Sequence, residues 1–159
     1  MSSIMASHYL NIFLTALFPI SEVRGAIPLG LIHYKLPLAG VVSVAVAGNM
    51  LPVIVFLKIF PFIEAQLKKC GFTRRLLDRL FTYTRKRHEE RFEIYKELAL
   101  AIFVAIPLPM TGAWSGMIAA YVFGIPFWRG TLMIFIGVLI ASLIVTLASL
   151  GIINFILIK

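Results

Sequence analysis

The chain has 159 residues, of which 60% are hydrophobic and 14% charged, with a mean hydropathy of +0.96. Soluble domains have about 45–50% apolar and about 25% charged residues, so this composition excludes a soluble globule and predicts an integral membrane protein. The net charge is +8, but ten of the 15 basic residues and six of the 7 acids lie within residues 61–97. We therefore expect these residues to face the cytoplasm and anionic membrane lipids, and we expect no binding of nucleic acid.

The first apolar block comprises residues 9–35 and residues 38–60. The stretch 9–35 contains LFPISEVRGAIPLG, in which two prolines remove backbone donors and interrupt a helix. We interpret it as a re-entrant hairpin, because each arm of about 10 residues reaches only half-way through a bilayer. Residues 38–60 follow a proline without interruption and are long enough for a transmembrane helix, at about 20 residues per span.

Residues 61–97 are predicted to form helices of their own between the two apolar blocks. Thr73 is a candidate N-cap, and the leucines after it line one face of a strongly basic amphipathic helix. Two interpretations stay open. The helix either lies in the membrane interface with its basic residues on lipid phosphates, or it is a solvated surface helix packed on the other helices.

The second apolar block repeats the order of the first. Residues 98–123 are interrupted at AIPLPMTGAWSG and are interpreted as a second re-entrant hairpin, and residues 127–150 are a second uninterrupted transmembrane helix. Two residue pairs recur at the same spacing in both blocks, namely Pro37 with Pro126 and Gly48 with Gly137. This order indicates an internal duplication.

The predicted fold class is an all-α integral membrane protein that forms a single membrane domain over residues 1–159. A re-entrant hairpin makes no net crossing, so the two transmembrane helices would run in opposite directions. The fold is then two inverted repeats, each a re-entrant helical hairpin plus one transmembrane helix, joined by the basic amphipathic helical loop. Both termini would lie outside. The alternative is four complete, kinked spans with both termini inside.

Glu22 and Arg24 are the most informative residues of the chain, because each lies in an apolar block where a charge costs about 2.5–3.5 kcal/mol. Glu22 is the only acid outside residues 61–97. The structural interpretation is that the two residues pair with each other or cap the broken helix. The functional interpretation assigns Arg24 to an anionic headgroup and Glu22 to proton exchange, and we favour it because a structural break could use neutral residues.

The tip of the second hairpin carries no charge but supplies backbone groups. Pro107 and Pro109 end the first arm, and Thr111 is the predicted N-cap of the returning arm, whose free amides favour anions. Returning arms that begin near Gly25 and Gly112 would bring two helix N-termini together. They would form a cradle for a phosphate or a carboxylate.

Two further side chains have open roles. Asn49, in the first transmembrane helix, either forms a structural hydrogen bond or lines a pathway. Trp114 either stacks on a ligand or anchors the second hairpin. The three histidines lack the spacing of a metal site, and the sequence contains no nucleophile triad or phosphate loop. We therefore expect no enzyme, no cofactor and no bound metal.

The stretches SEVRGAIPLG, GNMLP and PLPMTGAWSG resemble the small multidrug export protein family, a compact branch of the DedA (VTT-domain) superfamily. The resemblance covers nearly the whole chain. It implies two re-entrant hairpins that face each other in the bilayer, and for the superfamily a role in moving polyprenyl-phosphate or phospholipid carriers between leaflets. On that pattern the first tip holds Glu22, Arg24, Gly25 and Pro28, and the second holds Pro107, Pro109, Thr111 and Gly112. The larger DedA proteins carry acid and arginine residues in both hairpins, whereas the second tip here has neither.

The predicted function is that of a multi-pass plasma-membrane transporter, or flippase, that moves a phosphate-headed lipid and is coupled to protons through Glu22. The expected substrate-binding residues are Arg24, Gly25, Pro28, Asn49, Pro107, Pro109, Thr111, Gly112 and Trp114. The alternatives are a proton-coupled exporter of lipophilic cations and a non-transporting scaffold that recruits partners through its basic loop. A homodimer is expected, because so short a chain offers few helices to enclose a headgroup.

Overall fold

A computed structural model describes residues 2–67, 90–108 and 111–157, and the prediction of an all-helical fold is confirmed for these residues, which contain no β-strand. The predicted basic helix after Thr73, and with it most of the basic loop, lies outside the described residues. The helices are α1 (Ser2–Leu17), α2 (Glu22–Pro28), the π-helix η1 (Leu29–His33), α3 (Leu38–Leu67), α5 (Glu90–Ala105), α6 (Ala113–Val122) and α7 (Phe127–Leu157).

Two helices, α3 and α7, are long and apolar enough to cross a membrane, over Leu38–Ile63 and Phe127–Ile152. Each begins directly after a proline, whose fixed φ suits a helix start and whose missing amide is not needed there. Large apolar side chains stay exposed along α7, which is the pattern of a helix surrounded by lipid. Together with the apolar composition, these two helices indicate a membrane protein.

Three helices extend beyond the limits of the predicted segments. α3 continues past Phe60 and through Pro61 to Leu67, α5 begins at Glu90 rather than after residue 97, and α7 continues past residue 150. The residues added to α5 are mostly charged, and Glu and Lys are good helix formers, so this helix begins ahead of its apolar part. The residues added to α3 and α7 are mainly apolar and continue the same helices.

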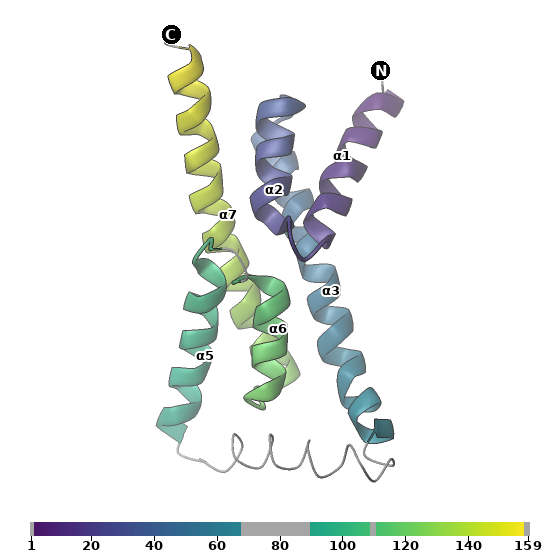
Figure 1. The fold of residues 1–159 in the computed structure, drawn as a ribbon, viewed down its shortest axis with the longest axis vertical. Coiled ribbons are helices and arrows are strands. Elements are labelled where there is room, and N and C mark those ends of the chain that lie inside the picture. Colours follow the sequence, from purple (N-terminus) through teal and green to yellow (C-terminus); the bar gives the residue numbers. More distant parts are fainter. Residues whose placement is uncertain (1, 68–89, 109–110, 158–159) are drawn as a thin grey trace.

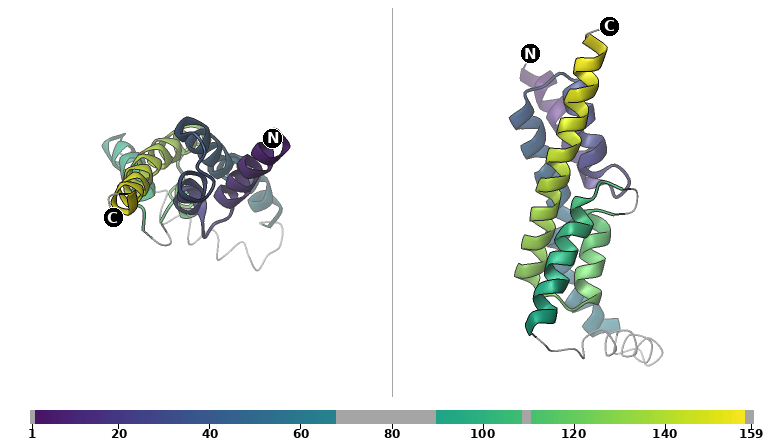
Figure 2. Two further views of the ribbon diagram at one scale, coloured as in Figure 1. Left: turned by 90° about the horizontal axis from the view of Figure 1, so that it is seen from above. Right: turned by 90° about the vertical axis from the view of Figure 1, so that its left-hand side faces the viewer.

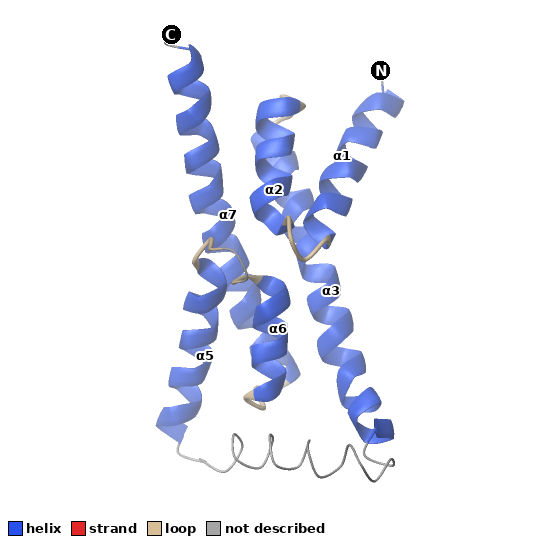
Figure 3. Ribbon diagram, in the orientation of Figure 1, coloured by secondary structure: helices blue, strands red, loops and turns tan. Residues whose placement is uncertain are grey.

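The short helices form two hairpins that approach each other between the long helices (Figure 1). The α1–α2 hairpin starts from the end of the molecule that holds both termini, and the α5–α6 hairpin starts from the opposite end. Their turns, tan in Figure 3, come together near mid-height. Figure 2 shows that α7 runs the length of the molecule beside both hairpins.

Each hairpin packs closely on the long helix of its own half through a glycine. A Cβ on Gly48 of α3 would lie 2.6 Å from the backbone oxygen of Phe13 in α1. A Cβ on Gly137 of α7 would lie 2.7 Å from the backbone oxygen of Ala101 in α5. Backbones can approach this closely only where the side chain is a hydrogen atom. The two glycines therefore fix the position of each hairpin on its long helix.

Candidate functional site

The candidate site lies where the two hairpin turns meet, and Glu22 is at its centre. Glu22 is the first residue of α2, is 4% exposed, and has a φ of 46°, a left-handed conformation that few residues other than glycine adopt. Its backbone N–H donates to the carbonyl of Phe18 at 3.0 Å and closes the α1–α2 turn. The strained backbone directs the Glu22 carboxylate towards the second hairpin.

The Glu22 carboxylate occupies the N-terminus of α6. Its Oε1 accepts a hydrogen bond from the backbone N–H of Trp114 at 3.3 Å. Its Oε2 lies so close to Gly112 that a Cβ there would be 2.0 Å away, and Gly112 itself has a φ of 142°. The first amides of a helix have no partner within the helix and carry partial positive charge, so a carboxylate is stabilised there.

The prediction that Thr111 is the N-cap of the returning arm was wrong. The N-cap of α6 is Gly112, and no side chain of its own hairpin caps it. The Thr111 hydroxyl instead donates towards the carbonyl oxygens of Ile106, at 2.7 Å, and Leu108, at 2.8 Å. These carbonyls follow the end of α5, whose last oxygens have no partner within the helix. The free amides of α6 are left to Glu22.

Arg24 donates hydrogen bonds to carbonyl oxygens of the turn between α5 and α6. Its guanidinium donates from Nη1 to the Leu108 carbonyl and from Nη2 to the Thr111 carbonyl, and Nη2 also donates to the Thr111 hydroxyl at 3.2 Å. Nη2 lies 3.8 Å from Glu22 Oε2. The Arg24 Nε is buried and has no hydrogen-bond partner. Arg24 is thus held by backbone oxygens of the second hairpin, and its charge is balanced by Glu22.

Trp114 makes the reciprocal contact from the second hairpin to the first. Its indole Nε1 donates to the carbonyl of Leu17, the last residue of α1, at 3.1 Å. This contact agrees with the interpretation of Trp114 as an anchor, and stacking on a ligand stays a prediction. Each hairpin therefore satisfies backbone groups at the broken end of the other, which neither could do alone. We call this set of contacts among Glu22, Arg24, Trp114 and the two turns the tip junction.

Two of the other predicted site residues, Pro107 and Gly25, lie at or near a turn. Pro107 lies in the turn after α5. Pro109 is outside the described residues. Gly25 faces its own hairpin, because a Cβ there would lie 3.0 Å from Ser21 Cβ and 3.6 Å from Thr15.

Pro28 was expected at the first tip, but it ends α2, about 9 Å along the helix from Glu22. The chain then continues as η1 rather than stopping, since a π-helical turn can absorb the missing donor.

Asn49 is buried completely in α3, and neither its Nδ2 nor its Oδ1 has a hydrogen-bond partner. It shares one helix face with Val41, Ala45 and Val53, at intervals of four residues, and all four are fully buried. Val41 of this face contacts Gly30 of η1, so the face is turned towards the first hairpin. The predicted structural hydrogen bond of the Asn49 side chain is therefore not present. The other interpretation, that Asn49 lines a pathway, stays a prediction.

Replacing Asn49 by leucine should leave the melting temperature in detergent unchanged or raise it, because a buried amide without partners costs about 1–3 kcal/mol. The control Asn11→Leu removes an observed hydrogen bond, from Asn11 Nδ2 to the Tyr34 hydroxyl at 3.1 Å. That variant should lose about 1 kcal/mol. A lower melting temperature for Asn49→Leu than for Asn11→Leu would mean that Asn49 is satisfied in the protein.

Sequence reasoning predicted that the free amides of the returning arm near Gly112 would attract an anion, but it missed that Glu22 itself occupies them. It also missed the carbonyls of Leu17 and Leu108 as partners of Trp114 and Arg24, because these groups are provided by position and not by side-chain type. A charged pair opposite an uncharged, proline-rich tip is the signal that could have matched the two hairpins. Among the described residues, no group of three or more His, Cys, Asp or Glu could hold a metal ion.

A family model described as "Putative small multi-drug export protein" matches residues 22–144, from the first residue of α2 through the second turn and into α7. The chain belongs to this family. The resemblance read from the sequence is thereby confirmed at the level of the small multidrug export proteins. The family description points to an exporter rather than to an enzyme. No curated protein and no solved structure matches the chain.

Proposed function

We propose that this member of the small multidrug export family is a plasma-membrane transporter that moves an anionic, phosphate-headed lipid across the bilayer. The observation that carries the proposal is the buried Glu22 carboxylate, which occupies the helix N-terminus of α6 beside Arg24. A helix N-terminus next to an arginine is a site for an anion. In the structure that anion is a carboxylate of the protein's own chain.

Re-entrant hairpins are part of the proposal and are supported by helix lengths and by topology. α1, α2, α5 and α6 contain 16, 7, 16 and 10 residues, fewer than the roughly 20 that a span needs. Four complete spans would also put the α3–α5 connection on the same side as the termini. The ends that it joins, Leu67 and Glu90, lie at the opposite end of the molecule from the termini (Figure 1).

The first turn also supports a position within the membrane. Phe18 and Ile20, in the turn between α1 and α2, are 61% and 95% exposed. Apolar side chains at an exposed turn would be unfavourable in water but are suited to lipid or to an apolar passage. We propose that the turn lies at membrane depth, where the tip junction satisfies the backbone groups that lipid could not.

Inverted repeats are supported by the paired glycines. Gly48 and Gly137 have the same spacing after Pro37 and Pro126, and each fixes a hairpin on its long helix. The two halves are oppositely directed in Figure 1, as the relation by inversion requires.

We include three further points in the proposal. The protein forms a homodimer, its basic loop faces the cytoplasm, and its family descends from the wider DedA superfamily.

The proposed mechanism is an exchange between two anions at the tip junction. While Glu22 is ionised, its carboxylate fills the α6 amides and balances Arg24, so the junction holds no net charge. When Glu22 takes up a proton, its charge is lost, and Arg24 and the helix N-terminus present net positive charge. A lipid phosphate can then replace the carboxylate. Return of the carboxylate as the proton leaves releases the lipid, which couples transport to protons.

A second candidate function is proton-coupled export of lipophilic cations, which the family description favours. In that mechanism the Glu22 carboxylate would alternate between a proton and the cationic compound. Arg24 at 3.8 Å opposes it, because the positive charge remains when the cation arrives. The third candidate, a non-transporting scaffold, would work without the tip junction.

Transport in proteoliposomes tests these functions with two probes, a fluorescent phosphatidylglycerol and the cationic dye ethidium. Glu22→Gln should abolish proton-dependent movement of the lipid, because a neutral side chain cannot exchange a proton. The matched control is Glu97→Gln, which removes a carboxylate that pairs with Arg129 at 3.2 Å outside the junction. It should transport normally. Movement of ethidium alone would establish the second candidate, and movement of neither probe would overturn the transporter proposal in favour of a scaffold.

A further inference from the structure

The buried face of α7 changes from apolar to polar along the helix. In its first half this face includes Ile134 and Val138, both buried. From residue 142 onward, the buried residues that the structure describes in α7 all carry a hydroxyl group, and they are Ser142, Thr146 and Ser149. Intervals of four and three residues place the three on one side of the helix. We call them the hydroxyl row.

The hydroxyl row begins level with the tip junction. α5 and α7 run in the same direction in Figure 1, and a Cβ on Gly137 of α7 would lie 2.7 Å from the backbone oxygen of Ala101 in α5. α5 ends one turn after Ala101, so its last residue and the turn that follows are level with Ser142. The other two hydroxyl residues lie about 6 Å and about 10 Å further towards the end that holds the termini.

This part of α7 borders the arm of the first hairpin that carries Glu22. α2 begins with Glu22 at the tip junction and leads back towards the terminus end, where η1 continues it. Both α2 and η1 contact α7, and both also contact α3. The hydroxyl row therefore accompanies this arm from the terminus end of the molecule to the junction.

Three buried polar groups on or around this arm have no hydrogen-bond partner. They are Arg24 Nε, the Asn49 amide on the α3 face turned towards the first hairpin, and Thr146 Oγ1. Hydroxyl groups in helices commonly donate to the carbonyl one turn back, as Ser142 and Ser149 do at 2.7 and 2.8 Å, but Thr146 does not. Buried polar groups that lack a protein partner are the ones that bind internal water.

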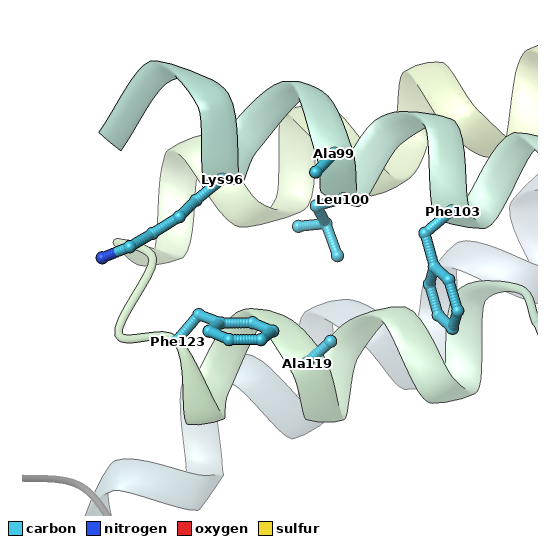
Figure 4. A pocket seen from close by; sticks show the side chains of 6 residues that line it. All are labelled: Lys96, Ala99, Leu100, Phe103, Ala119 and Phe123. Carbon is cyan, nitrogen blue, oxygen red and sulfur yellow. The ribbon is translucent and has the colours of Figure 1, made fainter. Parts of the chain in front are cut away.

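The other side of the junction has no such row among the described residues. The Thr131 hydroxyl of α7 is also buried without a partner, but its neighbours four residues before and three residues after, Phe127 and Ile134, are apolar. The pocket between α5 and α6 is lined by apolar side chains apart from Lys96 at one end (Figure 4). Water is therefore favoured on the terminus side of Glu22 and not on the side of the second hairpin.

We propose that the hydroxyl row holds a chain of water molecules through which Glu22 takes up its proton from the membrane face on which the termini lie. Hydroxyl groups one helical turn apart are separated by about 5–6 Å, which one water molecule spans with two hydrogen bonds. The serine hydroxyls donate to the helix and keep lone pairs that accept from water. The proton passes from water to water and ends on the Glu22 carboxylate, and the hydroxyl groups keep their own protons.

This assignment rests on the proton coupling proposed above and adds the side from which the proton arrives. Solid-state NMR of the full chain in liposomes tests the water without relying on transport. Magnetisation transferred from water should reach isotope-labelled Thr146 faster than isotope-labelled Ile134, which is fully buried on the apolar part of the same helix and serves as the control. Equally slow transfer to both residues would overturn the proposal.

The role of the hydroxyl row in coupling is tested with the fluorescent lipid in proteoliposomes. Thr146→Val should slow proton-driven movement about tenfold, the factor that corresponds to the loss of about one hydrogen bond, and Thr146→Ser should restore it. The melting temperature of Thr146→Val should be unchanged, because the hydroxyl has no protein partner.

Thr131→Val is the matched control, since it removes the same group from α7 on the other side of the junction, and it should transport normally. Slower movement in Thr131→Val with normal movement in Thr146→Val would overturn the assigned side. A wild type that moves no lipid would overturn the proposed function instead, and the NMR comparison of Thr146 with Ile134 would still decide whether the row holds water.

Discussion

The substitution Gly112→Ala should lower the free energy of unfolding by about 3 kcal/mol and the melting temperature in detergent by about 6–12 °C. Gly112 has a φ of 142°, in a region that only glycine adopts readily. A Cβ at this position would also lie 2.0 Å from Glu22 Oε2. The carboxylate would have to leave the α6 amides, and the helix would lose its cap. Thermal unfolding followed by circular dichroism measures the effect.

Gly151→Ala is the matched control for this prediction. Gly151 lies in α7, and a Cβ there would meet nothing within 4 Å. Alanine is the better helix former by up to about 1 kcal/mol, so this variant should melt at the same temperature as the wild type or higher. Equal melting temperatures for Gly112→Ala and Gly151→Ala would contradict the tip junction as described.

Arg24→Met should destabilise the protein by about 3–5 kcal/mol, the usual result of removing one partner of a buried ion pair. The Arg24 side chain is 20% exposed and that of Glu22 is 6% exposed, so water can replace the lost contacts only in part. The carbonyls of Leu108 and Thr111 would lose the guanidinium donor, although the Leu108 carbonyl keeps the Thr111 hydroxyl, and the Glu22 carboxylate would lose its counter-charge. Chemical unfolding of the variant in micelles gives the free-energy change.

A double-mutant cycle separates the ion pair from the backbone contacts. Glu22→Gln together with Arg24→Met should cost less than the sum of the two single variants, because the second change removes a charge that the first left unpaired. Arg129→Met is the control. Its side chain is 60% exposed and pairs with Glu97, so its loss should cost no more than about 1 kcal/mol. Strict additivity at the junction would mean that the two charges do not interact.

Glu22 and Arg24 show which part of the site could be predicted from the sequence. Two charges inside an apolar block need partners, and this need was evident from composition alone. Their partners were not evident, because they are backbone groups of a hairpin more than eighty residues away. The expected cap at Thr111 failed for the same reason. A local pattern selects the nearest suitable hydroxyl, whereas the fold supplies a stronger, charged acceptor from the other half of the chain.

The sequence by itself determined the helical class, the two long apolar helices that begin after Pro37 and Pro126, and the breaks between the short helices. These features follow from hydropathy, proline chemistry and the absence of alternation, which act over a few neighbouring residues. Only the tertiary structure decided how the broken ends meet, with Glu22 and Arg24 of one hairpin and Trp114 of the other each satisfying backbone groups of the opposite hairpin. Hydrogen-bond partners at a helix end are chosen by which groups the packed helices bring within about 3 Å, and no short stretch of sequence contains that information.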